Sequence, residues 1–210
     1  MSDRDEHKEA IDGMENARVY AAAHRKYAGL MYGGMVKDID GLNLSGRYLE
    51  MGAGPGYLAM MIAERKPDSE ITAVDISSDM IAVAGEFIQE KKLENKIHYI
   101  QGDVGEEQFM QKLGTFDLVY TTFSLHHWKD PHESIRNLWN AVRPGGALYI
   151  LDFRRIGWLC SLPVKWRELE SLRASFSSKE IEEMLQRTGI TDFHIKTAFP
   201  YLLQTAIAWK

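Results

Sequence analysis

The sequence predicts an α/β fold in which a doubly wound, mostly parallel sheet ends in an antiparallel hairpin. From residue 46 onward, short apolar segments alternate with helix-like ones, which favours parallel strands joined by right-handed helical crossovers. The last two strand-like segments, "DFHIKTAF" and "LLQTAIAWK", follow each other so closely that they should pair antiparallel. Residues 4–40 show helical spacing instead, so we expect a helical segment ahead of the sheet.

The helical segment is expected first, with an interruption at Gly33-Gly34. We assign residues 1–45 to an N-terminal helical lid and residues 46–210 to the sheet domain. The parallel strands are expected over residues 47–52, 70–76, 96–103, 116–123 and 147–153. The helices that follow the first four are expected over 57–65, 78–92, 106–113 and 131–142, and "RPGG" (143–146) is a turn.

Local signals support several of these helices. Ser77 or Ser78 is a suitable N-cap for the second of them, and Pro131 is tolerated in the first turn of the fourth. A last helix over residues 177–189 opens with a possible capping box of Ser177 and Glu180. The fifth strand is almost entirely apolar, as expected for a strand buried on both faces.

Composition limits the function classes. The chain has 210 residues, 45% of them hydrophobic, which suits one compact domain with at most a small appendage. A formal net charge of -5 does not favour a nucleic-acid-binding face. Cys160 is the only cysteine, so an internal disulfide and a Cys-rich zinc site are excluded. The charged first residues are not a signal peptide, and no apolar run approaches the roughly 18 residues of a membrane span. We therefore expect a cytoplasmic protein without membrane or nucleic-acid partners.

Three glycines mark the first candidate site. In "YLEMGAGPGY" (48–57), Gly52, Gly54 and Gly56 follow a strand that ends near Glu50. The dinucleotide pattern G-x-G-x-x-G would need a glycine at position 57, which is tyrosine. A pyrophosphate prefers helix-end amides without a nearby carboxylate, whereas a cationic amino-acid group would be attracted by Glu50.

The other strand ends complete this site. Asp75 ends the second strand and could accept hydrogen bonds from two ribose hydroxyls. Ile76 and Met80 would offer apolar surface to an adenine, while Asp103 could accept from its amino group. The remaining candidates are Ala53 in the glycine turn, Gly102 and Val104 beside Asp103, and Thr121, whose strand end has carbonyls that could bind an ammonium group.

At this point the sequence resembles the class I S-adenosylmethionine-dependent methyltransferases, and within them the small-molecule group related to ubiquinone/menaquinone-biosynthesis methyltransferases. The matching stretches occur in the family's order over residues 48–153: "YLEMGAGPG", "ITAVDIS", "IQGDV", "FDLVYTTFSLHHW" and "VRPGGALYILDF". The resemblance implies a seven-stranded Rossmann-like sheet and S-adenosyl-L-methionine as cofactor, with a small molecule as methyl acceptor. It implies that Glu50 and the three glycines cradle the methionine part, that Asp75 holds the ribose, and that Asp103 and Val104 flank the adenine.

Two adjacent histidines are the candidate catalytic residues. His126 and His127 follow the fourth strand, and either could take up a proton or contact the acceptor. The alternative is that one packs beneath the site while the other points outward. We expect no metal site, because adjacent residues of an extended segment point to opposite faces and no Cys, Asp or Glu completes an evident ligand set.

Candidate substrate-binding residues lie outside the matched stretches or at their edge. Tyr20, Tyr27 and Tyr32 recur along the helical segment, together with His24, and could contact cofactor or substrate or simply pack. Arg154 could bind a substrate carboxylate or phosphate, or form an ordinary ion pair. The aromatic and apolar residues of segment 156–176 could line a cavity or a dimer contact: Trp158, Leu162 and Trp166.

Two other functions remain open on the sequence. One is an NAD(P)-dependent oxidoreductase on a similar sheet, against which the glycine spacing and Glu50 count. The other is a non-catalytic module that binds S-adenosylmethionine. The sequence does not decide the acceptor atom (O, N, S or C) or the oligomeric state.

Overall fold

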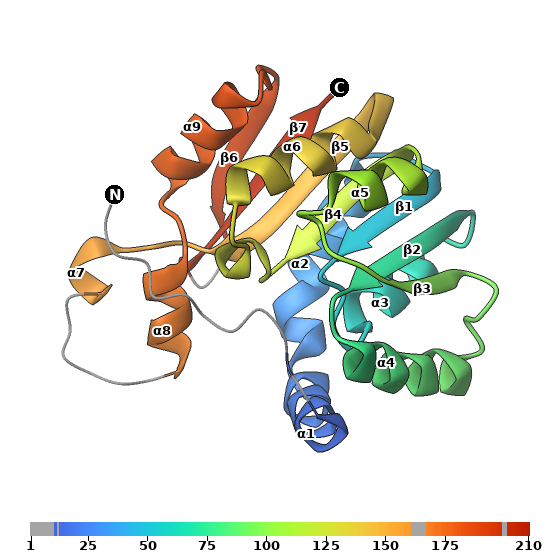
Figure 1. Ribbon diagram of the computed structural model, residues 1–210. Coiled ribbons are helices and arrows are strands. Elements are labelled where there is room, and N and C mark those ends of the chain that lie inside the picture. Colours follow the sequence, from blue (N-terminus) through green and yellow to red (C-terminus); the bar gives the residue numbers. More distant parts are fainter. Residues whose placement is uncertain (1–10, 12, 161–166, 199–200) are drawn as a thin grey trace.

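One seven-stranded sheet forms the centre of the molecule in the computed structural model, which describes residues 11, 13–160, 167–198 and 201–210 (Figure 1). The strand order is β3-β2-β1-β4-β5-β7-β6. The first five strands run parallel, and β7 is antiparallel to both β5 and β6. The strands are β1 (Gly46–Met51), β2 (Ser69–Asp75), β3 (Ile97–Gln101), β4 (Phe116–Thr122), β5 (Val142–Phe153), β6 (Phe193–Ala198) and β7 (Leu203–Trp209). The predicted doubly wound sheet with its terminal hairpin is confirmed.

Helices cover both faces of the sheet (Figure 1). One apolar cluster joins the sheet to α2 (Ala28–Gly41), α3 (Tyr57–Arg65) and α4 (Ser78–Lys91). The other joins it to α5 (Glu107–Leu113), α6 (Pro131–Ala141) and α9 (Ser178–Arg187). Four shorter or peripheral elements complete the fold: α1 (Met14–Arg25), the 3₁₀ turn η1 (Leu125–His127), α7 (Gly157–Cys160) and α8 (Arg167–Ala174). None of the helices in the described part of the chain is long and apolar enough to cross a bilayer.

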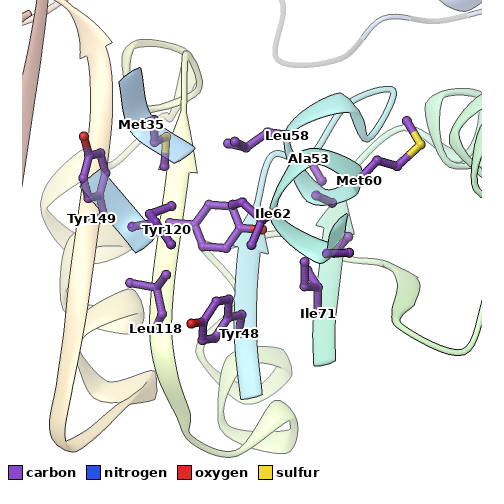
Figure 2. Packing of buried hydrophobic residues seen from close by; sticks show 14 of the residues in the cluster. Met35, Tyr48, Ala53, Leu58, Met60, Ile62, Ile71, Leu118, Tyr120 and Tyr149 are labelled. Carbon is purple, nitrogen blue, oxygen red and sulfur yellow. The ribbon is translucent and has the colours of Figure 1, made fainter. Parts of the chain in front are cut away.

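Three tyrosines form the floor of the core under α2 and α3. Tyr48, Tyr120 and Tyr149 are fully buried on the neighbouring strands β1, β4 and β5. In Figure 2 the ring of Tyr120 points toward Ile62 of α3. Their hydroxyls all have acceptors, because Tyr48 donates to the Leu44 carbonyl and Tyr149 to Asp38, while Tyr120 donates to Glu50. A buried hydroxyl without a partner would be costly, so these bonds fix the rings and the strands that carry them.

The local capping signals are confirmed. Ser77 caps α4 and accepts from the amide of Met80, and Pro131 occupies the first turn of α6. Ser177 and Glu180 form the reciprocal capping box at the start of α9. These three helices therefore begin where short-range hydrogen bonding predicts.

The expected helix interruption at Gly33-Gly34 is wrong. Both glycines lie inside α2, and the break falls instead at Lys26 and Tyr27. The reason is packing, because α1 packs against α4 whereas α2 packs against α3, so the chain must change direction between them. Burial of Met35 and Ile39 offsets the cost of two helical glycines.

The "RPGG" turn is absorbed into β5 as an irregularity. Val142 lies opposite Phe116, but the next pair is Ala147 with Leu118, so residues 143–146 bulge out of the ladder. Gly145 has φ of +81°, and a Cβ on Gly146 would lie 2.6 Å from the Asp117 carbonyl oxygen. Glycine is therefore required where the bulge meets the sheet.

Candidate active site

A cavity of about 1100 Å³ opens where the parallel strands end. Its walls come from the carboxyl ends of β1, β2, β4 and β5, the loop after β3, η1, and the N-terminal and α8 segments. All parallel strands end at the same edge, which is where doubly wound sheets bind ligands. Of the predicted site residues, the following line it: Glu50, Gly52, Ala53, Gly54, Asp75, Ile76, Met80, Gly102, Asp103, Val104, His126, His127, Tyr20 and Tyr32.

The glycine turn folds back onto β2. The amides of Gly52 and Ala53 both donate to the Val74 carbonyl, at 2.9 and 3.0 Å. Gly52 and Gly56 have φ of +72° and +80°, and a Cβ on them would lie 2.2 Å from the Ser124 hydroxyl and 2.7 Å from the Tyr99 hydroxyl, respectively. Side chains at either position would be strained and would clash, so the turn requires glycine at both, and Gly52 and Gly54 present bare backbone to the cavity.

Glu50 is a buried carboxyl group at this turn. It is 1% exposed and accepts a hydrogen bond from the Tyr120 hydroxyl at 3.2 Å. Burial raises the pKa of Glu50 to about 8, and the nearby Asp75 contributes to the rise. Among the described residues no cationic side chain forms an ion pair with Glu50. A cationic ligand would supply that missing partner.

Asp75 holds the turn in place and faces the same cavity. Its Oδ2 accepts from the Gly54 amide at 2.7 Å and its Oδ1 from the Ser77 amide at 2.9 Å. Burial raises the pKa of Asp75 above its ordinary value. Each carboxylate oxygen can accept a further hydrogen bond, so both could still bind ligand hydroxyls. Asp103 accepts from the Gly105 amide at 2.8 Å, and Val104 beside it is buried.

The two adjacent histidines occupy different environments. The His126 side chain is 1% exposed, and its Nδ1 donates to Asp152 Oδ1 at 2.7 Å. Its backbone amide donates to the other carboxylate oxygen of Asp152. His127 is half-buried, and its ring lies 4.0 Å from the His126 ring. Because an ionised carboxylate only accepts, the Asp152 pairing places a proton on Nδ1 of His126 and fixes the orientation of its ring.

Helices α1 and α2 cover one side of the cavity. Tyr57 donates to the Ala21 carbonyl at 3.0 Å, and the Ser77 hydroxyl donates to the Ile11 carbonyl at 2.8 Å. Tyr20 and His24 are stacked at 3.8 Å and both line the cavity. These contacts bring a segment from the start of the chain over the glycine turn.

Four of the remaining predicted residues, all of them described, are not among the residues that line the cavity: Gly56, Thr121, Tyr27 and Arg154. Gly56 is the N-cap of α3, and Thr121 is fully buried with its hydroxyl donating to the Met51 carbonyl. Tyr27 is 52% exposed, and Arg154 donates to the Tyr201 carbonyl. Trp158 belongs to α7, but its side chain lies outside the described structure, as do Leu162 and Trp166.

Several cavity residues were missed by sequence reasoning. The aromatic rings of Phe123 and Phe153 lie 5.1 Å apart at the ends of β4 and β5. Ser171 of α8 also lines the cavity. Asp152 could have been singled out from the sequence, because it is the one charged residue in the apolar run "ALYILDF". Its pairing with His126, however, depends on which strands are neighbours. In the described part of the chain no group of three or more His, Cys, Asp or Glu is arranged to hold a metal ion.

Comparisons with known proteins agree with this geometry. Residues 49–148 match a family described as "Methyltransferase domain". The demethylmenaquinone methyltransferase of Thermus thermophilus is 30% identical over 107 residues, which are 51% of this chain and 47% of that protein. Phosphoethanolamine N-methyltransferase 2 of Haemonchus contortus, solved with S-adenosyl-L-methionine, has a TM-score of 0.60 at 26% identity and is matched over 74% of this chain and 35% of that one. Human N-acetylserotonin methyltransferase, solved with SAM, shares the fold at a TM-score of 0.73 and 18% identity, over 94% of this chain and 56% of that one.

The chain spans less than two thirds of the length of the curated relatives it matches. The first three are covered over 26%, 36% and 47% of their own length. The shared part is the half of the sheet that carries the glycine turn and the strand ends after β2, β3 and β4.

Proposed function

We propose, from the premise that residues 49–148 form a class I S-adenosylmethionine-dependent methyltransferase domain, that this protein transfers a methyl group from S-adenosyl-L-methionine to a small molecule. The observation that carries the proposal is the carboxyl of Glu50, which is buried behind a bare glycine turn and forms no ion pair with any described residue. This arrangement suits a ligand that brings a positive charge, and it does not suit a pyrophosphate.

The residues of the cavity fit the cofactor. Glu50 would hold the ammonium group of the methionine part, next to the exposed backbone of Gly52 and Gly54. Asp75 has acceptor capacity on both oxygens for ribose hydroxyls. Ile76, which is 37% exposed, and the buried Val104 offer apolar surface to the adenine, with Asp103 at its edge.

The chain's contribution to the reaction is positioning and control of protons. When bound, S-adenosylmethionine supplies an activated methyl group on its sulfonium. Holding an acceptor in line can supply roughly 7–11 kcal/mol of the barrier reduction. The His126–His127 pair, anchored by Asp152, would take up the proton of an acceptor that arrives protonated, and such a base contributes about 10²–10⁴-fold.

The N-terminal helices would act as the lid of this site. Tyr20, His24 and Tyr32 line the cavity from α1 and α2, and α1 has its own small apolar cluster with α4, whereas α2 belongs to the core of the sheet. We therefore keep residues 1–45 as the lid and 46–210 as the methyltransferase domain. On the basis of its composition, we further propose that the protein acts in the cytoplasm and has neither nucleic acid nor a membrane as partner.

The relatives do not agree on an acceptor. They are named for demethylmenaquinone, phosphoethanolamine and N-acetylserotonin, which share no functional group as a set. Each of these three names denotes a small molecule, and this supports a small-molecule acceptor here.

Calorimetric titration with S-adenosylmethionine, S-adenosylhomocysteine and NADH tests the proposal. We expect micromolar binding of the two sulfur ligands and none of NADH. S-adenosylhomocysteine at about 100 times its dissociation constant should stabilise the protein by about 2.7 kcal/mol. NADH binding, or no binding of either sulfur ligand, would contradict the proposal.

A matched pair of variants locates the site. Asp75→Ala should weaken S-adenosylhomocysteine binding at least tenfold, because a charged acceptor of two hydrogen bonds is lost. Asp68→Ala, at an exposed position ahead of the same strand, should leave affinity unchanged. Formation of S-adenosylhomocysteine during incubation with pools of small molecules would distinguish an enzyme from a module that only binds the cofactor.

A further inference from the structure

Strand β3 forms one of the two edges of the sheet (Figure 1). In the part of the chain that the structure describes, it pairs only with β2. The Lys96 carbonyl and the Gly102 amide both bond to β2, at 2.8 and 3.1 Å. Because alternate residues of a strand direct their backbone groups to opposite sides, the amides and carbonyls of Tyr99 and Gln101 point away from the sheet. This edge therefore offers a row of backbone groups to a further strand.

The side chains of this edge do not protect it against such pairing. Sheets usually protect an edge with lysine, proline or a bulge. The other edge strand, β6, follows this rule with the exposed Lys196. Strand β3 contains neither lysine nor proline, and its register with β2 is regular. Its Ile100 is 38% exposed instead, so the edge combines outward backbone groups with an exposed apolar side chain.

The edge is held in place from the inside of the molecule. The Tyr99 hydroxyl donates to the Gly54 carbonyl at 3.1 Å, and Nε2 of Gln101 donates to the Ile76 carbonyl at 3.0 Å. Ile97 is buried in the core of the sheet. These contacts fix the conformation of β3 before any partner binds, which lowers the entropy that pairing would cost.

The two ends of β3 carry opposite charge. Residues 91–96 contain three lysines and one glutamate, whereas residues 102–107 contain three carboxylic acids and neither lysine nor arginine. Lys91 forms an ion pair with Glu64, but at an exposed position where such a pair contributes little. Two copies of β3 related by a two-fold axis run antiparallel, so the basic end of each meets the acidic end of the other. This complementarity favours a second copy of the chain as the occupant of the edge.

One register uses the outward groups and buries the exposed isoleucine. If Ile100 lies opposite Ile100 of the second copy, Tyr99 lies opposite Gln101 of that copy, and the two such pairs form about four backbone hydrogen bonds. A register centred on Tyr99 would need the amide of Ile97, which already donates to the Leu93 carbonyl at 3.0 Å. The register centred on Ile100 is therefore favoured.

We propose that two copies of this chain pair antiparallel through β3, with Ile100 at the two-fold axis, so that their sheets join into one. The inference does not depend on the proposed function, because it uses the edge of the sheet and the charges that flank it. Because the edge strand is short, we expect a transient dimer with a dissociation constant on the order of 10 µM.

Sedimentation equilibrium of the full chain tests the dimer. Over a range from about 1 µM to about 200 µM, the mass should rise from that of one chain to that of two. A protein that remains a single chain over this whole range overturns the inference.

A matched pair of variants tests the backbone pairing. Gln101→Pro removes an amide that points away from β2, so the ladder within the sheet is kept while each copy loses one outward donor. It should weaken dimerisation at least tenfold. Gln101→Ala loses the same side-chain bond to the Ile76 carbonyl but keeps the amide, so it should dimerise like the unmodified protein. Equal dimerisation of the two variants would contradict the pairing.

A second pair tests the position of the axis. Ile100→Lys places two like charges against each other at the centre of the interface, and we expect at least a tenfold weaker dimer. The fold should tolerate this change because Ile100 is exposed. Thr197→Lys introduces the same side chain on the other edge strand and is the control. A dimer that survives Ile100→Lys places the interface elsewhere and overturns the inference.

Hydrogen exchange locates the interface without any substitution. The amides of Tyr99 and Gln101 should exchange at least tenfold more slowly at the high protein concentration than at the low one, because only the dimer gives them acceptors. The amides of β6 should exchange equally at both concentrations. Concentration-dependent protection of β6 instead of β3 would contradict the proposal.

Discussion

Glu50 shows at the scale of a single residue how a fold prepares a charged site. It lies opposite Tyr120 in the β1–β4 ladder, and Tyr120 in turn lies opposite Tyr149 in β5. Two buried tyrosines thus follow the buried carboxyl group across the sheet. In these surroundings the protonated form of Glu50 is favoured unless a cation binds next to it.

Cofactor binding should therefore release a proton. At pH 7 Glu50 is mostly protonated, since its pKa is about 8. The ammonium group of the ligand favours the carboxylate, so we expect up to about one proton released per bound S-adenosylhomocysteine. Calorimetry in two buffers of different ionisation enthalpy measures it. Glu50→Gln should release none, and equal heats for the unmodified protein in both buffers would contradict the assignment.

Asp152 is the second residue on which the site depends. Its carboxylate accepts from Nδ1 and the amide of His126 and from the amide of Phe153, and it is 1% exposed. Asp152→Ala should lower the free energy of unfolding by about 3–5 kcal/mol, because it leaves a buried polar ring without its partner. Chemical denaturation measures the loss.

A double variant separates this cost from simple loss of packing. Asp152→Leu combined with His126→Phe replaces the pair by apolar groups, so it should be more stable than Asp152→Ala. If the double variant is the less stable one, the buried pair is not the cause.

At the scale of elements, α1 is attached differently from the other helices. Its buried residues Ala17 and Ala21 form a small cluster with Met80 and Val83 of α4, separate from the two main cores. Partly buried Tyr20 and Phe87 pack against this cluster, and a half-exposed ion pair joins Arg18 to Glu86. Exposed pairs of this kind contribute little, so α1 is the helix most easily displaced without unfolding the sheet.

Displacing α1 should weaken ligand binding and leave the fold intact. Ala21→Leu would overpack the contact with α4, so we expect at least a fivefold loss of S-adenosylhomocysteine affinity with little change in the unfolding midpoint. Ala23→Leu, on the exposed side of the same helix, is the control. Equal affinities for the two variants would show that α1 does not cover the site.

At the scale of the whole molecule, the buried carboxyl groups of the site lower the free energy of unfolding of the ligand-free protein. The pKa of Glu50 rises from 4.5 to about 8 on folding, and the pKa of Asp75 is raised as well. At a pH between the unfolded and the folded pKa, such a group binds more protons in the folded state than in the unfolded state. Stability must then fall as the pH rises through that window.

The free energy of unfolding should therefore decrease from pH 5.5 to pH 7.5. We expect a loss on the order of 2 kcal/mol, at about 1.4 kcal/mol per pH unit for one proton. Urea denaturation at several pH values measures it, and Glu50→Gln should give a flatter profile. A wild-type stability that rises with pH over this range would contradict the burial of Glu50 as a carboxylic acid.

Features that depend on residues close together in the chain could be predicted from the sequence. Strand and helix order, the caps at Ser77 and Ser177, and the hairpin of β6 and β7 follow from local patterns. The edge of the sheet at which the cavity opens was predictable for the same reason. Parallel strands bring their carboxyl ends to one edge, so Glu50, Asp75 and Asp103 were expected there.

The surroundings of His126 depend on tertiary contacts. The pairing of Asp152 with His126 requires β4 and β5 to be adjacent in a given register, and the ring contacts of Phe123 with Tyr32 and Phe153 join three distant segments. The break between α1 and α2 likewise depends on two different packing partners. These features rest on contacts between residues far apart in the chain, whose free energies have no signature in local spacing.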